Sequence, residues 1–115
     1  MSVPVPLDEL RERIAEFGVP YLITVGAGGA HVVSARAELD GGSVVVAAGR
    51  TSRSNVASQP AVTLLWPALV GGPYALIVDG NAVVADGQLL VAPTRAVLHR
   101  VADASADLPS CVPLT

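Results

Sequence analysis

The first apolar positions of the chain repeat with the period of a helix. They are Leu7, Leu10, Ile14 and Phe17. Side chains spaced three or four residues apart lie on one side of a helix and give it a buried stripe. Pro6 suits the first helical position, while Gly18 and Pro20 end such a helix. The pattern predicts an N-terminal helix over residues 7–17 that covers one end of the fold.

From Tyr21 onward the pattern favours strands instead of helices. Alternating or continuous Val-rich apolar segments predict six strands at residues 21–25, 31–39, 43–48, 61–66, 74–85 and 88–92. The turn signals between them are Ala27-Gly28-Gly29, Asp40-Gly41-Gly42 and Asp86-Gly87. In the fifth strand, Tyr74 to Asp79 runs on through Gly80 as a bulge to Ala85.

Two further segments have helical features. Between the third and fourth predicted strands, the hydroxyl residues of segment 49–60 can cap a short helix that Pro60 closes. Residues 93–100 predict a final helical turn, and the composition of residues 101–115 is that of a tail. These elements predict a mainly β fold, a small barrel that occupies residues 1–115 as a single domain.

Composition limits the classes of partner. Of the 115 residues, 51% are hydrophobic and 15% are charged, so burial at a subunit interface would help a core of this size. The net charge of −3 leaves no basic stripe for nucleic acid. The N-terminus lacks a basic start followed by an apolar run, and no apolar segment is long enough to span a membrane. We expect a cytoplasmic homo-oligomer that contacts neither nucleic acid nor membrane.

Residues for catalysis or metal binding are few. His31 and His99 have no cysteine or carboxylate at ligand spacing, which favours a structural or surface role for both. Cys111 is the single cysteine, and we expect an unpaired thiol without a chemical role. The glycines at 26–29 lie in a hairpin with no helix after it, so they do not form a phosphate-binding loop.

A cluster of hydroxyl and guanidinium groups is the most informative feature. Arg50, Thr51, Ser52, Arg53 and Ser54 fall together where a strand ends and a short helix begins. Helix-start amides, hydroxyls and arginines are the groups that bind phosphate. Arg36, on the same face of strand 31–39 as Ser34, would add a second guanidinium from the side. The same residues also fit a solvated basic turn, and composition alone does not separate these two interpretations.

The order of short motifs along the chain resembles a known family. The motifs are Ser34-Ala35-Arg36, Ser52-Arg53, the segment Gln59-Pro60-Ala61-Val62-Thr63-Leu64-Leu65-Trp66, and Val78-Asp79-Gly80. They resemble the pyridoxamine 5′-phosphate oxidase-like family of flavin-binding split barrels. The resemblance implies a six-stranded split β-barrel of Greek-key type, with FMN (flavin mononucleotide) between the subunits of an obligate homodimer. It further implies that Arg36, Ser52 and Arg53 bind the phosphate, while Ala47 and Ala48 lie beside the flavin ring.

The chain also departs from that family. Ser54 stands where the oxidase has lysine, and Ala75 stands where it has glutamine. The long C-terminal substrate-binding segment of the oxidase has no counterpart here, so pyridoxamine phosphate is not the expected substrate.

Three functions remain open at this point. The first is an oxidoreductase that uses FMN or a deazaflavin on an unidentified small molecule. The second is a flavin- or ligand-binding protein without turnover, and the third is a cofactor-free dimerisation module.

Overall fold

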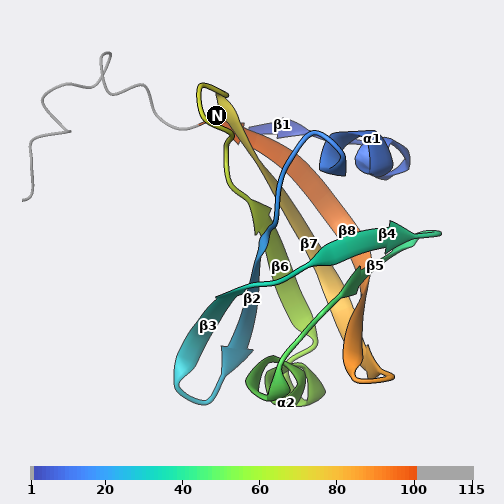
Figure 1. Cartoon of the computed structure of the whole chain (residues 1–115). Coiled ribbons are helices and arrows are strands. Elements are labelled where there is room, and N and C mark those ends of the chain that lie inside the picture. The colour runs from blue at the N-terminus through green and yellow to red at the C-terminus, as the bar shows by residue number, and fades with distance from the viewer. Residues whose placement is uncertain (1, 101–115) are drawn as a thin grey trace, which may run out of the picture.

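The protein is described by a computed structural model over residues 2–100, whose path Figure 1 shows. Its elements, in chain order, are β1 (Ser2–Pro4), the 3₁₀ helix η1 (Leu7–Glu9), α1 (Leu10–Ile14), β2 (Tyr21–Gly26), β3 (Gly29–Ser34), β4 (Ala37–Asp40), β5 (Ser43–Val46), α2 (Arg50–Ser58), β6 (Ala61–Trp66), β7 (Tyr74–Ala85) and β8 (Gln88–Arg100).

The strands form one antiparallel sheet that curls into an incompletely closed barrel. The order is β3-β2-β6-β7-β8-β5-β4, and β1 adds to β8. At the two ends of this path, β3 and β4 are joined through Ala35 and Arg36. The N–H of Ala35 donates to the carbonyl of Pro20 at 3.0 Å, whereas the carbonyl of Arg36 accepts from the N–H of Ala47 at 2.9 Å. The chain therefore changes partner between these two residues, and the barrel is split there.

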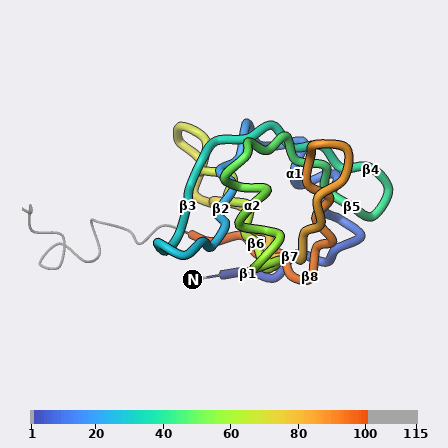
Figure 2. The backbone as a smooth tube through the Cα atoms, turned by 90° about the horizontal axis from the view of Figure 1, so that it is seen from below, coloured from blue at the N-terminus to red at the C-terminus, as the bar shows by residue number. Residues whose placement is uncertain are grey.

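The inward side chains of the strands form the core. Leu22, Leu64 and Leu76 are fully buried, as is Trp66. The two helices lie at opposite ends of the barrel in Figure 1, and the view in Figure 2 shows α2 within the ring of strands. Val56 of α2 is 3% exposed, so this helix completes the core from below. Burial of these aliphatic side chains is the main stabilising term of the fold.

The predicted fold class is confirmed. The fold is mainly β, and α2 lies between the third and fourth predicted strands. β6 has the predicted bounds, and β7 continues through a register shift between Asp79 and Gly80, as expected of a bulge. Asp86 and Gly87 have φ angles of 52° and 76°, which is the backbone that a two-residue hairpin turn requires.

Other predicted elements were wrong in extent or type. Strand 31–39 is two strands because its halves pair with β2 and β5 respectively, and β1 was not predicted; the sheet therefore has eight strands instead of six. The predicted helix 7–17 is a 3₁₀ turn followed by α1. After Ile14, the bonds from Glu16 to Arg13 and from Phe17 to Ile14 tighten it into turns.

The predicted helical turn at residues 93–100 is the second half of β8. It pairs with β7 along its length and with β1 at its end, and its Ala96 and Val97 are buried. Packing between two strands outweighs the local helical preference. Within residues 2–100, no helix is long and apolar enough to cross a membrane. The predicted tail, with Cys111, lies outside the described residues.

Candidate functional site

The site predicted for phosphate lies where the barrel is split. Arg36 is exposed, and its carbonyl accepts from the N–H of Ala47 at 2.9 Å. Ala47 and Ala48 follow β5 directly and lead through Gly49 into α2. The backbone of Arg36 therefore lies next to the segment that links the end of β5 to the start of α2.

The start of α2 has backbone donors that the helix does not use. Its N-cap is Gly49, in extended conformation, and no side chain caps the helix. The predicted capping by hydroxyl groups is therefore wrong. The first intrahelical bond joins the N–H of Arg53 to the carbonyl of Gly49 at 3.1 Å. The N–H groups of Arg50, Thr51 and Ser52 precede it, so they have no acceptor in the helix and carry its positive end.

The side chains around this helix start differ in exposure. Arg50, Thr51 and Ser54 are exposed, whereas Ser52 is 2% exposed and faces the interior. The exposed groups can reach a ligand from solvent. The buried hydroxyl of Ser52 points away from solvent, so only its backbone N–H is available at the helix start.

Arg53 connects the helix to two other segments. Its Nη1 donates to the carbonyl of Ala48 at 2.6 Å and to the carbonyl of Gly87 at 3.3 Å. Gly87 lies in the tight turn between β7 and β8. The guanidinium thereby ties that turn to the end of β5, and these bonds leave Nε and Nη2 of Arg53 for other acceptors. The sequence contained no sign of the contact with Gly87, which is 34 residues away.

A second contact fixes α2 against β2. The Nδ2 of Asn55 donates to the Oγ1 of Thr24 at 3.0 Å, and Thr24 is fully buried. The amide of Asn55 also lies against Gly26, where a Cβ would come within 2.5 Å of its Oδ1. The sequence gives no direct sign of this contact between Asn55 and strand β2. The hydrogen bond and the packing on Gly26 together set the position of the start of α2.

Metal-binding side chains do not cluster among residues 2–100. No three His, Cys, Asp or Glu side chains in that range lie close enough to hold a metal ion. His99 is exposed, with its Nδ1 3.2 Å from the Oγ of Ser2, and His31 is half-buried on β3.

Two curated mycobacterial proteins are clearly similar in sequence. The uncharacterized protein Mb0449c of Mycobacterium bovis is 38% identical over 125 aligned residues, which cover 92% of this chain and 86% of the relative. The same figures hold for the uncharacterized protein MT0457 of Mycobacterium tuberculosis. This chain belongs to their family. Because the alignment spans most of both chains, the Mb0449c family shares the whole barrel. No family model matches the chain.

Solved structures show the fold of the Mb0449c family. HupZ of Group A Streptococcus superposes with a TM-score of 0.63 at 13% identity, over 84% of this chain and 95% of HupZ. General Stress Protein 26 of Bacillus anthracis superposes with a TM-score of 0.56 at 15% identity, over 81% of this chain and 99% of that protein. Both are split barrels of the pyridoxamine 5′-phosphate oxidase-like fold, and this chain shares that fold.

Proposed function

We propose that this protein is a homodimeric flavin-binding split barrel that holds the phosphate of FMN, or of a deazaflavin coenzyme, at the start of α2. The observation that carries the proposal is the uncapped helix start beside Arg36. Three backbone N–H groups without helical acceptors lie next to the split, and two exposed arginines, Arg36 and Arg50, are on the adjoining segments.

The donor set fits a phosphate. A helix start favours an anion because its N–H groups point outward and the helix dipole is positive there. The hydroxyl of Thr51 adds a short hydrogen bond, and Arg36 adds a planar group that can contact two phosphate oxygens. Ser54 is exposed one turn further along and lies within the same polar segment.

Arg53 has two roles in the proposed site. With Nη1 it holds the carbonyls of Ala48 and Gly87, and so fixes the shape of the loop before α2. With Nε and Nη2 it contacts the phosphate. Its charge also supports anion binding where the related oxidase has an additional lysine and this chain has Ser54.

The flavin ring lies beside Ala47 and Ala48 in this proposal. Ala47 is exposed and Ala48 packs against the core, so the two small side chains leave room for a flat apolar group. A second subunit supplies the opposite wall, which also buries apolar surface that a small barrel leaves in solvent. When bound, the cofactor supplies hydride transfer to a small-molecule substrate; the protein binds and orients it.

Titration of the purified protein with FMN and with a deazaflavin coenzyme tests this function. We expect quenching of flavin fluorescence and a bound cofactor that a physiological reductant reduces and an acceptor reoxidises. Arg36→Ala should weaken binding by about 10- to 100-fold, which corresponds to the loss of one charge-assisted contact. Arg11→Ala is the matched control, since Arg11 is an exposed arginine on α1.

Two results would contradict the proposal. One is the absence of binding by the wild-type protein to either cofactor. The other is an equal effect of Arg36→Ala and Arg11→Ala, because net charge alone would then explain the change. Tight binding without reduction or reoxidation would support a binding protein without turnover.

A further inference from the structure

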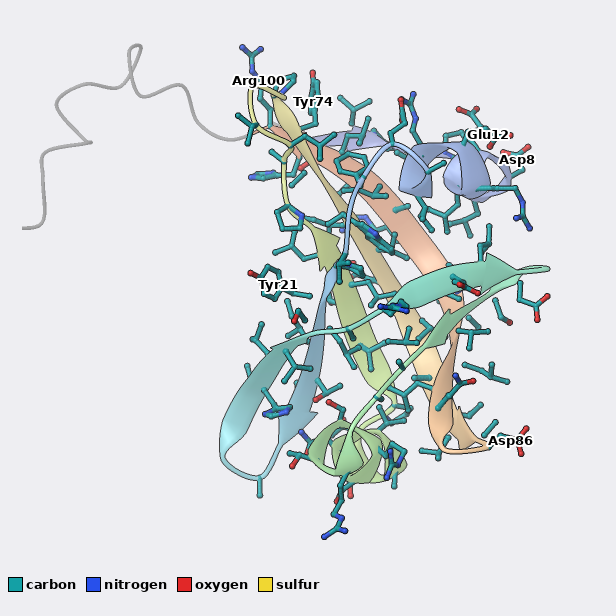
Figure 3. The ribbon with its side chains drawn as sticks, in the orientation of Figure 1. Asp8, Glu12, Tyr21, Tyr74, Asp86 and Arg100 are labelled. Atoms are coloured by element: carbon teal, nitrogen blue, oxygen red, sulfur yellow. The ribbon has the colours of Figure 1, made fainter. Side chains whose placement is uncertain are left out.

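The outer face of the sheet carries an exposed apolar patch. Side chains alternate along β2, so Leu22 and Thr24 are buried while Tyr21 and Val25 are 42% and 45% exposed. Val32 of β3 lies opposite Ile23 and is 55% exposed. Figure 3 shows Tyr21 pointing away from the barrel.

We call this surface the outer patch. In the sheet register its half-buried members Leu65 and Ile77 lie beside Tyr21 on β6 and β7. The full patch comprises Tyr21, Ile23, Val25, Val32, Leu65 and Ile77.

Two opposite charges stand on the same face, next to the outer patch. Asp79 of β7 and Arg95 of β8 are directly opposite each other in the sheet. The hydroxyl of Thr63 donates to the Oδ1 of Asp79 at 2.7 Å, which fixes the direction of the carboxylate. The Oδ2 is 3.9 Å from the Nη1 of Arg95, and the side chains of Asp79 and Arg95 are 41% and 66% exposed. Such a long, exposed contact contributes little to the stability of one chain.

We propose that two copies of this chain pack through the outer patch about a two-fold axis, with Asp79 of each subunit paired to Arg95 of the other. This inference rests on the homodimer of the proposed function and names the surface that forms it. In a two-fold interface the same surface meets itself, so a residue that contacts a second residue is contacted by it in return. A face with one acidic and one basic side chain beside an apolar patch is complementary to its own copy.

The arrangement suits such an interface in two further ways. Thr63 already holds Asp79 in place, so little side-chain freedom is lost when the second subunit binds. The apolar neighbours exclude water from the pair, and the charges fix the relative orientation of the two subunits.

Charge reversal separates pairing between subunits from pairing within one chain. The mass of the wild-type protein, Asp79→Arg and Arg95→Asp is measured in solution across a range of concentrations, by sedimentation or light scattering. We expect a wild-type dimer. The dimer dissociation constant of each variant should be about 100-fold higher than that of the wild type, because the altered contact occurs twice in a two-fold dimer. Asp8→Arg is the matched control, since Asp8 is an exposed acid on η1, away from this face.

An equimolar mixture of the two variants is the decisive sample. Asp79→Arg presents two arginines and Arg95→Asp presents two aspartates, so the mixture should form a heterodimer with wild-type affinity. A monomeric wild-type protein would overturn the inference, and so would a mixture that does not restore the dimer. Circular dichroism of each variant checks that the fold is retained.

The same samples distinguish this inference from the cofactor proposal. Dimers that follow the charge pattern but bind no flavin would support the interface and refute the cofactor assignment. A wild-type monomer that binds FMN would support the cofactor assignment and refute the interface.

Discussion

The contact of Asn55 on α2 with Thr24 and Gly26 on β2 allows a quantitative prediction of stability. Gly26→Ala places a Cβ 2.5 Å from the Oδ1 of Asn55 and 3.0 Å from its Cγ, so the amide must move. That movement breaks the bond from Asn55 to Thr24, whose Oγ1 is fully buried. A buried polar group left without a partner costs about 1–3 kcal/mol. We therefore expect Gly26→Ala to lower the free energy of unfolding by about 1–3 kcal/mol.

Asn55→Ala removes the same bond by another route. It leaves Thr24 equally unpaired, but alanine is a better helix former than asparagine, which returns up to about 0.7 kcal/mol. The atoms nearest to the added Cβ of Gly26→Ala all belong to Asn55. In the Asn55→Ala background the collision is absent, and the double variant should be no less stable than Asn55→Ala alone. The two effects are therefore strongly non-additive.

Urea unfolding at one fixed protein concentration measures these differences, since the proposed dimer would make stability concentration-dependent. Trp66 is the single tryptophan and is 1% exposed, so its fluorescence reports loss of the core. Gly28→Ala is the matched control, because nothing lies within 4 Å of its added Cβ. Additive losses from Gly26→Ala and Asn55→Ala would refute the reasoning, since the two changes would then act at separate places.

Two other substitutions test neighbouring parts of the fold. Gly80→Ala should destabilise the barrel by about 1–3 kcal/mol, because its Cβ would lie 2.5 Å from the carbonyl oxygen of Ala92, and urea unfolding against Gly28→Ala measures this loss. Arg53→Ala should weaken FMN binding by roughly 1.5–3 kcal/mol. It should also lower the unfolding free energy by about 0.5–1.5 kcal/mol, since the part-buried bond to the carbonyl of Ala48 and the exposed bond to that of Gly87 are lost; Arg11→Ala should do neither.

Local signals were sufficient for the parts of the fold that depend on neighbouring residues. The bounds of β6 followed from its apolar segment after Pro60, and the Asp86-Gly87 turn followed from residues that tolerate positive φ. The bulge at Gly80 was also predicted from its glycine. A Cβ at this position would lie 2.5 Å from the carbonyl oxygen of Ala92 on β8, so the position requires glycine.

Other features depend on partners far away in the chain. Residues 93–100 are a strand because β7 and β1 flank them, and strand 31–39 is divided because Ala35 and Arg36 bond to different segments. Neither partner is visible in a local window. For the same reason the bonds from Arg53 to Gly87 and from Asn55 to Thr24 could not be predicted, whereas composition and resemblance did suggest Arg36 and Arg53 as candidate phosphate ligands.

A comparison of FMN with riboflavin tests most directly whether the start of α2 binds the phosphate of a flavin. The two ligands share the ring and differ in the phosphate. Fluorescence titration should give a Kd for riboflavin at least about 100-fold higher than for FMN, since several charge-assisted contacts are lost. Equal Kd values would contradict the account, because the phosphate would then make no contact with the helix start.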